Sequence, residues 1–318
     1  MLATGLACQP SLKRLDLWGI SISDRGLQDL VRGLVNCNLE KLSLVFSGNM
    51  LMDSVSGMKS LGSLVGRTTS MRSLCLRESL TDIGLHYLVE GIMQHCSLTE
   101  LYLSHNHFIT ANGLPSLSSL FRAEHCSLCI LYLYGINFGN DGAAVLAGGL
   151  IGNKSLTELR FNPTDSGITA RGWAAFSRLL CDTSSVNSTY LSNHTLQQVG
   201  DYGITNTPSD ILLFSRLNKL QFRAAAICKI LHSHPDIDVT PLFQFNLKCL
   251  PLVVAWLEKA KQYLDNVNES TESFQGRCLS AVYKFIRGMP QLVADGYRRQ
   301  KKDIQSDAKK KRKFDLTL

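Results

Sequence analysis

The stretch Leu98-Thr-Glu-Leu101-Tyr-Leu103 carries the Leu-x-x-Leu-x-Leu pattern that decides the fold. The pattern occurs six times before residue 162, and successive copies start 27, 32, 27, 30 and 28 residues apart. The copies start at Leu12, Leu39, Met71, Leu98, Leu128 and Leu156. The last two apolar positions of each copy are separated by one residue, which is the period of a short β-strand. Spacing this regular indicates an internal repeat.

A helical half follows the strand half in most repeats. Apolar residues and glycines then recur at intervals of three and four, as in Gly84-Leu85, Leu88 and Gly91-Ile92, which makes one face of a helix. Neither half can bury its apolar face alone, so neighbouring units must stack. We therefore predict an α/β fold over residues 1–200, a solenoid with a curved parallel sheet inside and helices outside.

The repeats resemble the ribonuclease-inhibitor-like class of leucine-rich repeats, whose units have this length and end in a helix. Asn106 stands where that class often has an asparagine after the strand, and the second repeat is longer, with Ser47-Gly48-Asn49 opening an irregular stretch. Residues 2–12 align without a gap on residues 146–156, inside a helical half. We therefore expect the first repeat to be incomplete, with an open apolar edge at the first strand, so that the sequence is either truncated or pairs there with something else.

A different organisation follows the repeats. Residues 201–218 are rich in turn-forming residues and are expected to be a linker, and residues 219–297 show helical periodicity, with helices near 219–234, 246–264 and 277–297. Three stretches, His232–Phe243, Leu250–Lys259 and Val282–Pro290, resemble the C-terminal helical region of leucine-rich-repeat proteins of diatoms and related algae. That resemblance implies an architecture and a lineage, and it implies no reaction.

The positive charge of the chain is concentrated at its end. The whole sequence has 33 Lys and Arg against 26 Asp and Glu, a net charge of +7, of which residues 298–318 hold nine basic and three acidic residues. The near-neutral remainder disfavours a general nucleic-acid-binding protein. The run Lys309, Lys310, Lys311, Arg312, Lys313 is typical of a nuclear import signal, and an electrostatic contact with nucleic acid or anionic lipid is the alternative.

Candidate chemical sites are weak in this sequence. Cys126 and Cys129 have C-x-x-C spacing, with His125 beside them and His95-Cys96 one repeat earlier, but the cysteines recur at matching repeat positions, as buried packing residues do. His232 and His234, before Pro235-Asp236, read as a turn. We expect no catalytic residue, cofactor or metal.

The sequence also predicts a location. No apolar run approaches the roughly 18 residues of a membrane span. Scattered cysteines without a signal peptide favour an intracellular protein, and it is nuclear or nucleocytoplasmic if the basic run is an import signal.

The concave side of the predicted sheet is the better candidate site. Residues that alternate with the leucines must face it and be exposed, and equivalent positions on neighbouring strands lie about 4.8 Å apart. The partner-binding residues predicted there are Arg14, Asp16, Trp18, Arg77, Glu100, Tyr102, Tyr132, Tyr134, Glu158 and Arg160. Tyr, Trp and Arg are the residues enriched at interface hot spots. The sequence therefore predicts a non-enzymatic module that binds a protein partner. The alternatives are a GTPase-activating protein of the Ran-activator type and a substrate receptor in ubiquitin ligation.

Overall fold

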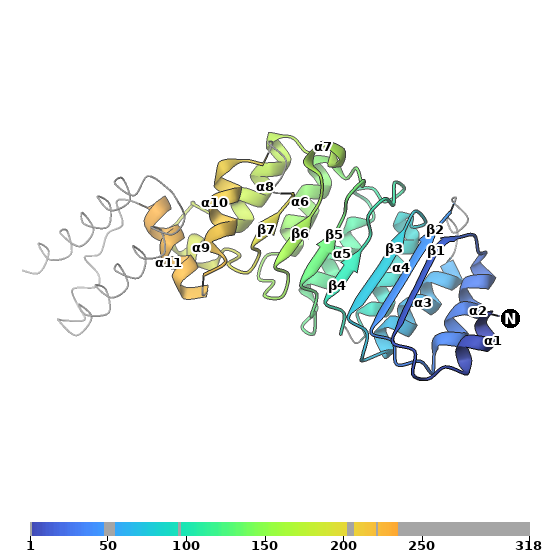
Figure 1. Cartoon of the computed structure of the whole chain (residues 1–318). Coiled ribbons are helices and arrows are strands. Elements are labelled where there is room, and N and C mark those ends of the chain that lie inside the picture. The colour runs from blue at the N-terminus through green and yellow to red at the C-terminus, as the bar shows by residue number, and fades with distance from the viewer. Residues whose placement is uncertain (1, 48–54, 95–96, 202–206, 221, 235–318) are drawn as a thin grey trace, which may run out of the picture. The chain divides into compact units, whose positions relative to one another are not determined.

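The computed structural model describes residues 2–47, 55–94, 97–201, 207–220 and 222–234 (Figure 1). The chain divides into two compact units, residues 1–226 and 227–318, and the first contains all of the strands that the structure describes. The helices expected near 246–264 and 277–297 and the basic run 309–313 lie outside the described residues.

A seven-stranded parallel sheet forms one layer of the first unit, and its strands follow each other in chain order. The strands are β1 (Arg14–Ile20), β2 (Lys41–Phe46), β3 (Ser73–Arg77), β4 (Glu100–Tyr102), β5 (Ile130–Tyr132), β6 (Glu158–Arg160) and β7 (Gln198–Val199). The six Leu-x-x-Leu-x-Leu copies supply β1 to β6, as predicted. The middle leucines of the copies are in register from strand to strand, for example Leu101 with Leu131 and Leu131 with Leu159.

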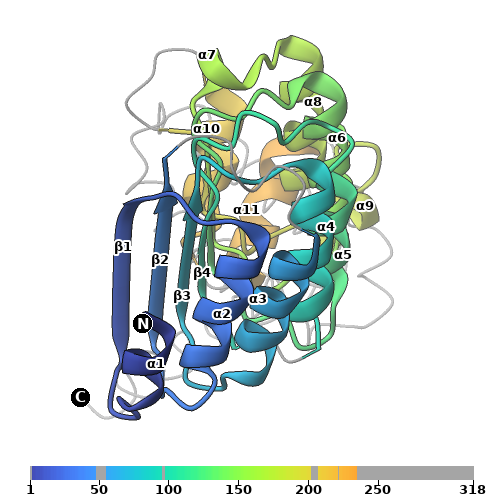
Figure 2. The same ribbon diagram turned by 90° about the vertical axis from the view of Figure 1, so that its right-hand side faces the viewer.

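Helices cover one side of this sheet, and the side opposite them is called the open face here (Figure 2). The first unit contains α1 (Leu2–Ala7), α2 (Asp24–Leu34), α3 (Val55–Arg67), α4 (Asp82–Ile92), α5 (Leu114–Arg122), α6 (Gly139–Gly149), α7 (Pro163–Ser166), α8 (Ala170–Leu180), α9 (Val186–Leu191) and α10 (Ser209–Leu217). The last described helix, α11 (Phe222–Ser233), spans the boundary between the two units. The strand-and-helix alternation confirms the predicted solenoid class.

The core lies between the sheet and the helices. The repeat leucines of β2 to β6 are buried, as are the apolar residues of the helix faces that point at them. Leu15 and Leu17 of β1 are half-buried instead, because the structure places a neighbouring strand on only one side of β1. None of the helices in the described part of the chain has the length and apolar run that crossing a bilayer requires.

Half-buried polar side chains join some of the neighbouring repeats. At the ends of the helices, Oδ1 of Asp24 accepts a hydrogen bond from the backbone N–H of Gly57 (2.7 Å), and Oδ1 of Asn140 accepts one from Gly172 (2.9 Å). These side chains satisfy donors that a helix N-terminus leaves without an intrahelical partner. The stacking of repeats therefore depends on specific hydrogen bonds as well as on apolar burial.

The segment after α8 differs from the sequence prediction. The structure places α9 and β7 within residues 186–199, the end of the range assigned to the solenoid, and α10 within residues 201–218, where a linker was expected. Asn193 explains the difference, because its Oδ1 accepts from the backbone N–H of Thr195 and Leu196 (both 2.9 Å). Asn153 does the same for the residues that precede β6. The sixth repeat is therefore longer than the others, and β7 begins a seventh.

Candidate functional site

The open face carries three rows of side chains, one for each strand position that alternates with the leucines. In the middle row, Tyr102 pairs in register with Tyr132, and Tyr132 pairs with Arg160. The exposure along these rows is uneven. Side chains on β1 are exposed, and those of the tyrosines and their neighbours on β4 to β6 are half-buried. The difference arises because large side chains on adjacent strands pack against each other and cover part of one another.

The centre of the site is a stack of aromatic rings capped by a guanidinium. The rings of Tyr102 and Tyr132 lie 4.3 Å apart at an angle of 8°, and the ring of Tyr134 lies 6.2 Å from that of Tyr132. The guanidinium carbon of Arg160 lies 5.4 Å from the centre of the Tyr132 ring, within the range of a cation–π interaction. The predicted residues on β4 to β6 therefore form one contiguous group.

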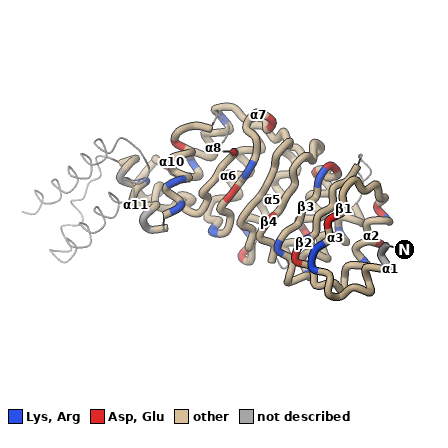
Figure 3. Tube along the Cα trace, in the orientation of Figure 1, with Lys and Arg blue, Asp and Glu red and all other residues tan. Residues whose placement is uncertain are grey.

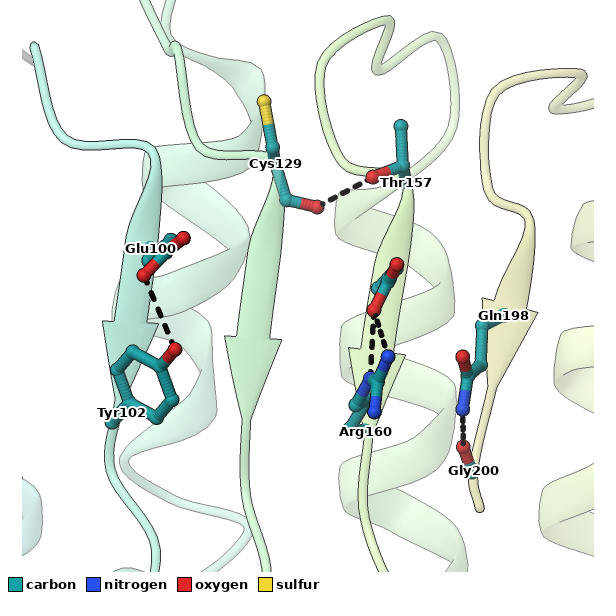
Figure 4. Close-up of polar contacts among 8 residues, drawn as sticks. Glu100, Tyr102, Cys129, Thr157, Arg160, Gln198 and Gly200 are labelled. Carbon is teal, nitrogen blue, oxygen red and sulfur yellow. Dashed lines mark hydrogen bonds and ion pairs between the residues drawn. The ribbon is translucent and has the colours of Figure 1, made fainter. Parts of the chain in front are cut away.

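Two carboxylates hold the polar ends of this group in place. The hydroxyl of Tyr102 donates to Oε2 of Glu100 at 3.1 Å (Figure 4). Nε of Arg160 donates to Oε2 of Glu158 at 2.7 Å, and a terminal nitrogen of the same guanidinium lies 2.6 Å from that oxygen. Each carboxylate thus fixes the residue two positions after it on its own strand. The six residues Glu100, Tyr102, Tyr132, Tyr134, Glu158 and Arg160 are called the tyrosine cluster below.

The surroundings of the cluster raise the pKa of two of its phenols, those of Tyr102 and Tyr134. Burial raises the pKa of Tyr102, and the neighbouring charge of Glu100 raises it further. Burial also raises the pKa of Tyr134, with a contribution from the carboxylate of Asp201. Burial alone would lower the pKa of Arg160, but the hydrogen bond and charge of Glu158 outweigh it and raise that pKa. The Tyr102 and Tyr134 hydroxyls therefore stay neutral beside the permanent cation of Arg160, which suits recognition.

Asp201 is a residue of this site that the sequence analysis missed. Its carboxylate is hydrogen-bonded to the Tyr134 hydroxyl, and it follows Gly200, which has a positive φ of 76°. The side-chain amide of Gln198 on β7 donates to the carbonyl of Gly200 at 3.2 Å (Figure 4). The signal in the sequence was Leu196-Gln-Gln-Val199, which repeats the first half of the pattern 40 residues after Leu156.

The other predicted residues lie on the same face but apart from the tyrosine cluster. Arg14, Asp16 and Trp18 lie on β1, three strand spacings or about 14 Å from β4. The Trp18 side chain is 71% exposed. Arg77 lies on β3 and is half-buried. The structure therefore divides the predicted surface into two parts.

The cysteine and histidine groups form no metal site within the described residues, where no three His, Cys, Asp or Glu side chains gather around one point. The Cys129 thiol donates to the carbonyl of Ser127 at 3.3 Å, and burial raises its pKa. His95 and Cys96, like Pro235 and Asp236, fall outside the described residues.

Comparisons with known proteins agree with the repeat class. No family model matches the chain. Human NACHT, LRR and PYD domains-containing protein 5 is 29% identical over 193 residues, 59% of this chain and 13% of that protein. Pig ribonuclease inhibitor is 29% identical over 225 residues, 69% of this chain and 47% of that protein. The chain thus spans less than half the length of these relatives. Fold, repeat and relatives together show a leucine-rich-repeat solenoid of the ribonuclease-inhibitor-like kind.

Proposed function

We propose that this solenoid is a non-enzymatic interaction module that binds a protein partner on the open face of its sheet, centred on the tyrosine cluster. The stacked pair Tyr102 and Tyr132 under the Arg160 guanidinium carries the proposal. Tyrosine and arginine contribute large contact areas at low cost in conformational entropy when they are already held in place. Pig ribonuclease inhibitor, by its name, acts on an enzyme, which supports a protein as the partner class.

The two rival functions share the fold, and a fold does not determine a function. A GTPase activator of the Ran-activator type must accelerate GTP hydrolysis, so a hydrolysis assay with Ran separates it from a passive binder. A substrate receptor in ubiquitin ligation must bind a ligase adaptor in addition to its substrate.

We also infer a lineage near the leucine-rich-repeat proteins of diatoms from the resemblance of residues 232–290, almost all of which lie outside the described residues.

The first test removes both stacked rings. We expect Tyr102→Ala with Tyr132→Ala to weaken binding of a partner isolated by crosslinking and affinity purification by about 30-fold or more, because hot-spot tyrosines contribute about 2 kcal/mol or more. The measurement is the Kd of that purified partner for each variant, at equal folded fraction by circular dichroism.

The matched control replaces two tyrosines on the helical side, Tyr87 and Tyr190, which are on α4 and α9. We expect Tyr87→Ala with Tyr190→Ala to leave that Kd within about twofold, as for contacts outside a hot spot. Equal weakening by both pairs, or no weakening by the pair from the open face, would contradict the proposed function.

The basic run gives a separate prediction about location. We propose that residues 298–318, through Lys309 to Lys313, direct the protein to the nucleus. Fusing these residues to a cytoplasmic fluorescent reporter is expected to move most of the fluorescence into the nucleus. Replacing the five basic residues with glutamine is expected to return the fluorescence to the cytoplasm. A reporter that stays cytoplasmic with the native run would rule out the import signal.

A further inference from the structure

One end of the open face is basic. Among the described residues of β1 to β3, the side chains at alternating positions include the cations Arg14, Lys41 and Arg77 and one carboxylate, that of Asp16. Arg14 and Lys41 are direct register partners on neighbouring strands, and Oδ1 of Asp16 lies 3.8 Å from Nζ of Lys41. Like charges placed directly opposite each other destabilise a sheet. One carboxylate against three cations leaves an excess of positive charge at this end.

The other end has the opposite sign. On β4 to β6 and just after β7, the described charged side chains at this face are Glu100, Glu158 and Asp201 with one cation, Arg160. Figure 3 shows charged segments along β1 to β3, and a red and a blue segment on β6. The face therefore has a positive end at β1 to β3 and a negative end at the tyrosine cluster.

Two further observations mark the basic end as a place where something binds. Trp18, Val45 and Arg77 form a row in register, and Trp18 is the most exposed of the large apolar side chains that the structure describes. Nε of Arg77 is buried and has no hydrogen-bond acceptor among the described residues. An indole exposed to water and a buried guanidinium nitrogen without an acceptor are each costly in the free protein. The first cost falls when a partner packs apolar surface on the indole, and acidic side chains of that partner complement the three cations of this end of the face.

We propose that a basic patch formed by Arg14, Trp18, Lys41 and Arg77 binds an acidic segment of the protein partner. An apolar side chain of that segment packs on the Trp18 indole, and its carboxylates face the three cations. This inference rests on the proposed function, because it assigns one end of the same partner. It also orients that partner, whose acidic segment lies over β1 to β3 while its remaining surface covers the tyrosine cluster. Complementary charge of this kind steers association and fixes orientation.

The patch favours a protein segment over a polyphosphate backbone. The Asp16 carboxylate lies inside the patch, and Glu40, at its border, pairs with Lys13 at 2.9 Å. The hydrogen bond and charge of Lys13, with the more distant charges of Arg14 and Arg72, lower the pKa of Glu40, so this carboxylate stays ionised at neutral pH. Evenly spaced phosphates of a nucleic acid would meet both carboxylates. A peptide can place its acidic residues apart from them.

The test uses three labelled probes of similar length, namely a glutamate-rich peptide with a central leucine, its lysine-rich counterpart and single-stranded oligo-dT. We expect the glutamate-rich peptide to bind and to change the fluorescence of Trp18, a signal that is lost in Trp18→Phe. Arg14→Glu with Lys41→Glu is expected to raise the Kd of the glutamate-rich peptide about tenfold or more. Added salt is expected to raise the same Kd in the native protein. Arg14→Gln with Lys41→Gln adds no new repulsion. Its Kd for the glutamate-rich peptide is therefore expected to lie between that of the native protein and that of the glutamate variant.

The control reverses two exposed arginines on the helical side, Arg25→Glu with Arg178→Glu, which changes the net charge by the same amount. We expect this control to leave the Kd within about twofold, since charges beyond a Debye length are screened. The proposal is overturned if the control weakens binding of the glutamate-rich peptide as much as the reversal at Arg14 and Lys41 does. It is also overturned if the lysine-rich peptide or oligo-dT binds as tightly as the glutamate-rich peptide or more tightly.

The isolated partner separates this proposal from the function on which it rests. If the double alanine variant at Tyr102 and Tyr132 loses the partner and the reversal at Arg14 and Lys41 does not, the proposed function stands and the basic patch is rejected. If the reversal weakens the partner and the tyrosine variant leaves it unchanged, the basic patch stands and the tyrosine cluster loses its role. If neither variant changes the Kd, both are rejected.

Discussion

Replacing Gly91 with valine is expected to lower the free energy of unfolding by about 3 kcal/mol or more, at or above the usual cost of overpacking. Gly91 on α4 faces Gly62 and Gly66 on α3, and the two helices meet backbone to backbone. A Cβ at Gly91 would overlap the carbonyl carbon of Gly62 and lie 2.6 Å from both the Gly62 Cα and the Ser63 nitrogen. Backbone atoms cannot move aside as a side chain does, so the helices must separate. Urea denaturation followed by circular dichroism measures the loss.

The control for this prediction is Gly148→Ala on α6, where a Cβ meets nothing within 4 Å. Alanine in an unobstructed helix position stabilises by about 0.5–1 kcal/mol, because it restricts the unfolded chain. The two substitutions should therefore act in opposite directions. A Gly91→Val protein as stable as the native one would show that α3 and α4 are not packed as the structure has them.

The sequence predicted the fold because its two periodicities are local and repeat. The leucines at intervals of two and three place β1 to β6, and the intervals of three and four place the helices on the other side. The sequence also predicted that Tyr102 and Tyr132 are neighbours, since equivalent positions in successive repeats become adjacent on the sheet. Register alone carries that prediction.

The finer geometry of the site depends on side-chain packing that no periodicity encodes. The 8° angle between the tyrosine rings and the position of Arg160 over Tyr132 follow from hydrogen bonds to Glu100 and Glu158. Those bonds exist because each carboxylate lies two residues before its partner on one strand face, where both are half-buried. The sequence analysis expected the side chains between the leucines to be exposed. On β4 to β6 they are half-buried instead, because they pack against one another.

The last repeat shows where a local pattern is insufficient. Strand β7 has two residues, and the insertion of α9 delays it to 40 residues after the previous pattern, outside the usual spacing. Its position is fixed by Asn193, whose side-chain amide donates to the carbonyl of Leu150 at 3.0 Å in the preceding repeat. A long-range hydrogen bond of this kind appears in the structure, and the spacing of the leucines does not predict it.

The same kind of bond makes Asn106 the second position with a large expected effect. Its Oδ1 accepts from the backbone N–H of Ser79 and of Leu80 (both 2.9 Å), and its Nδ2 donates to the carbonyls of Leu76 (2.9 Å) and Leu103 (2.7 Å). Asn106 is 1% exposed, so water cannot replace these bonds. We expect Asn106→Ala to cost about 4 kcal/mol, at about 1 kcal/mol for each of the four bonds. Urea denaturation measures the loss.

Asn112→Ala is the matched control, because Asn112 is exposed and its change should stay within about 0.5 kcal/mol. Asn106→Asp provides a further test of the mechanism. The new carboxylate keeps the two accepted bonds but faces two carbonyl oxygens, so burial and repulsion raise its folded pKa above the unfolded value of about 3.9. A raised pKa means that the folded state binds the extra proton, so stability relative to the native protein should fall as pH rises above about 4. A deficit that does not change with pH would show that the carbonyls of Leu76 and Leu103 are not what holds the amide of Asn106.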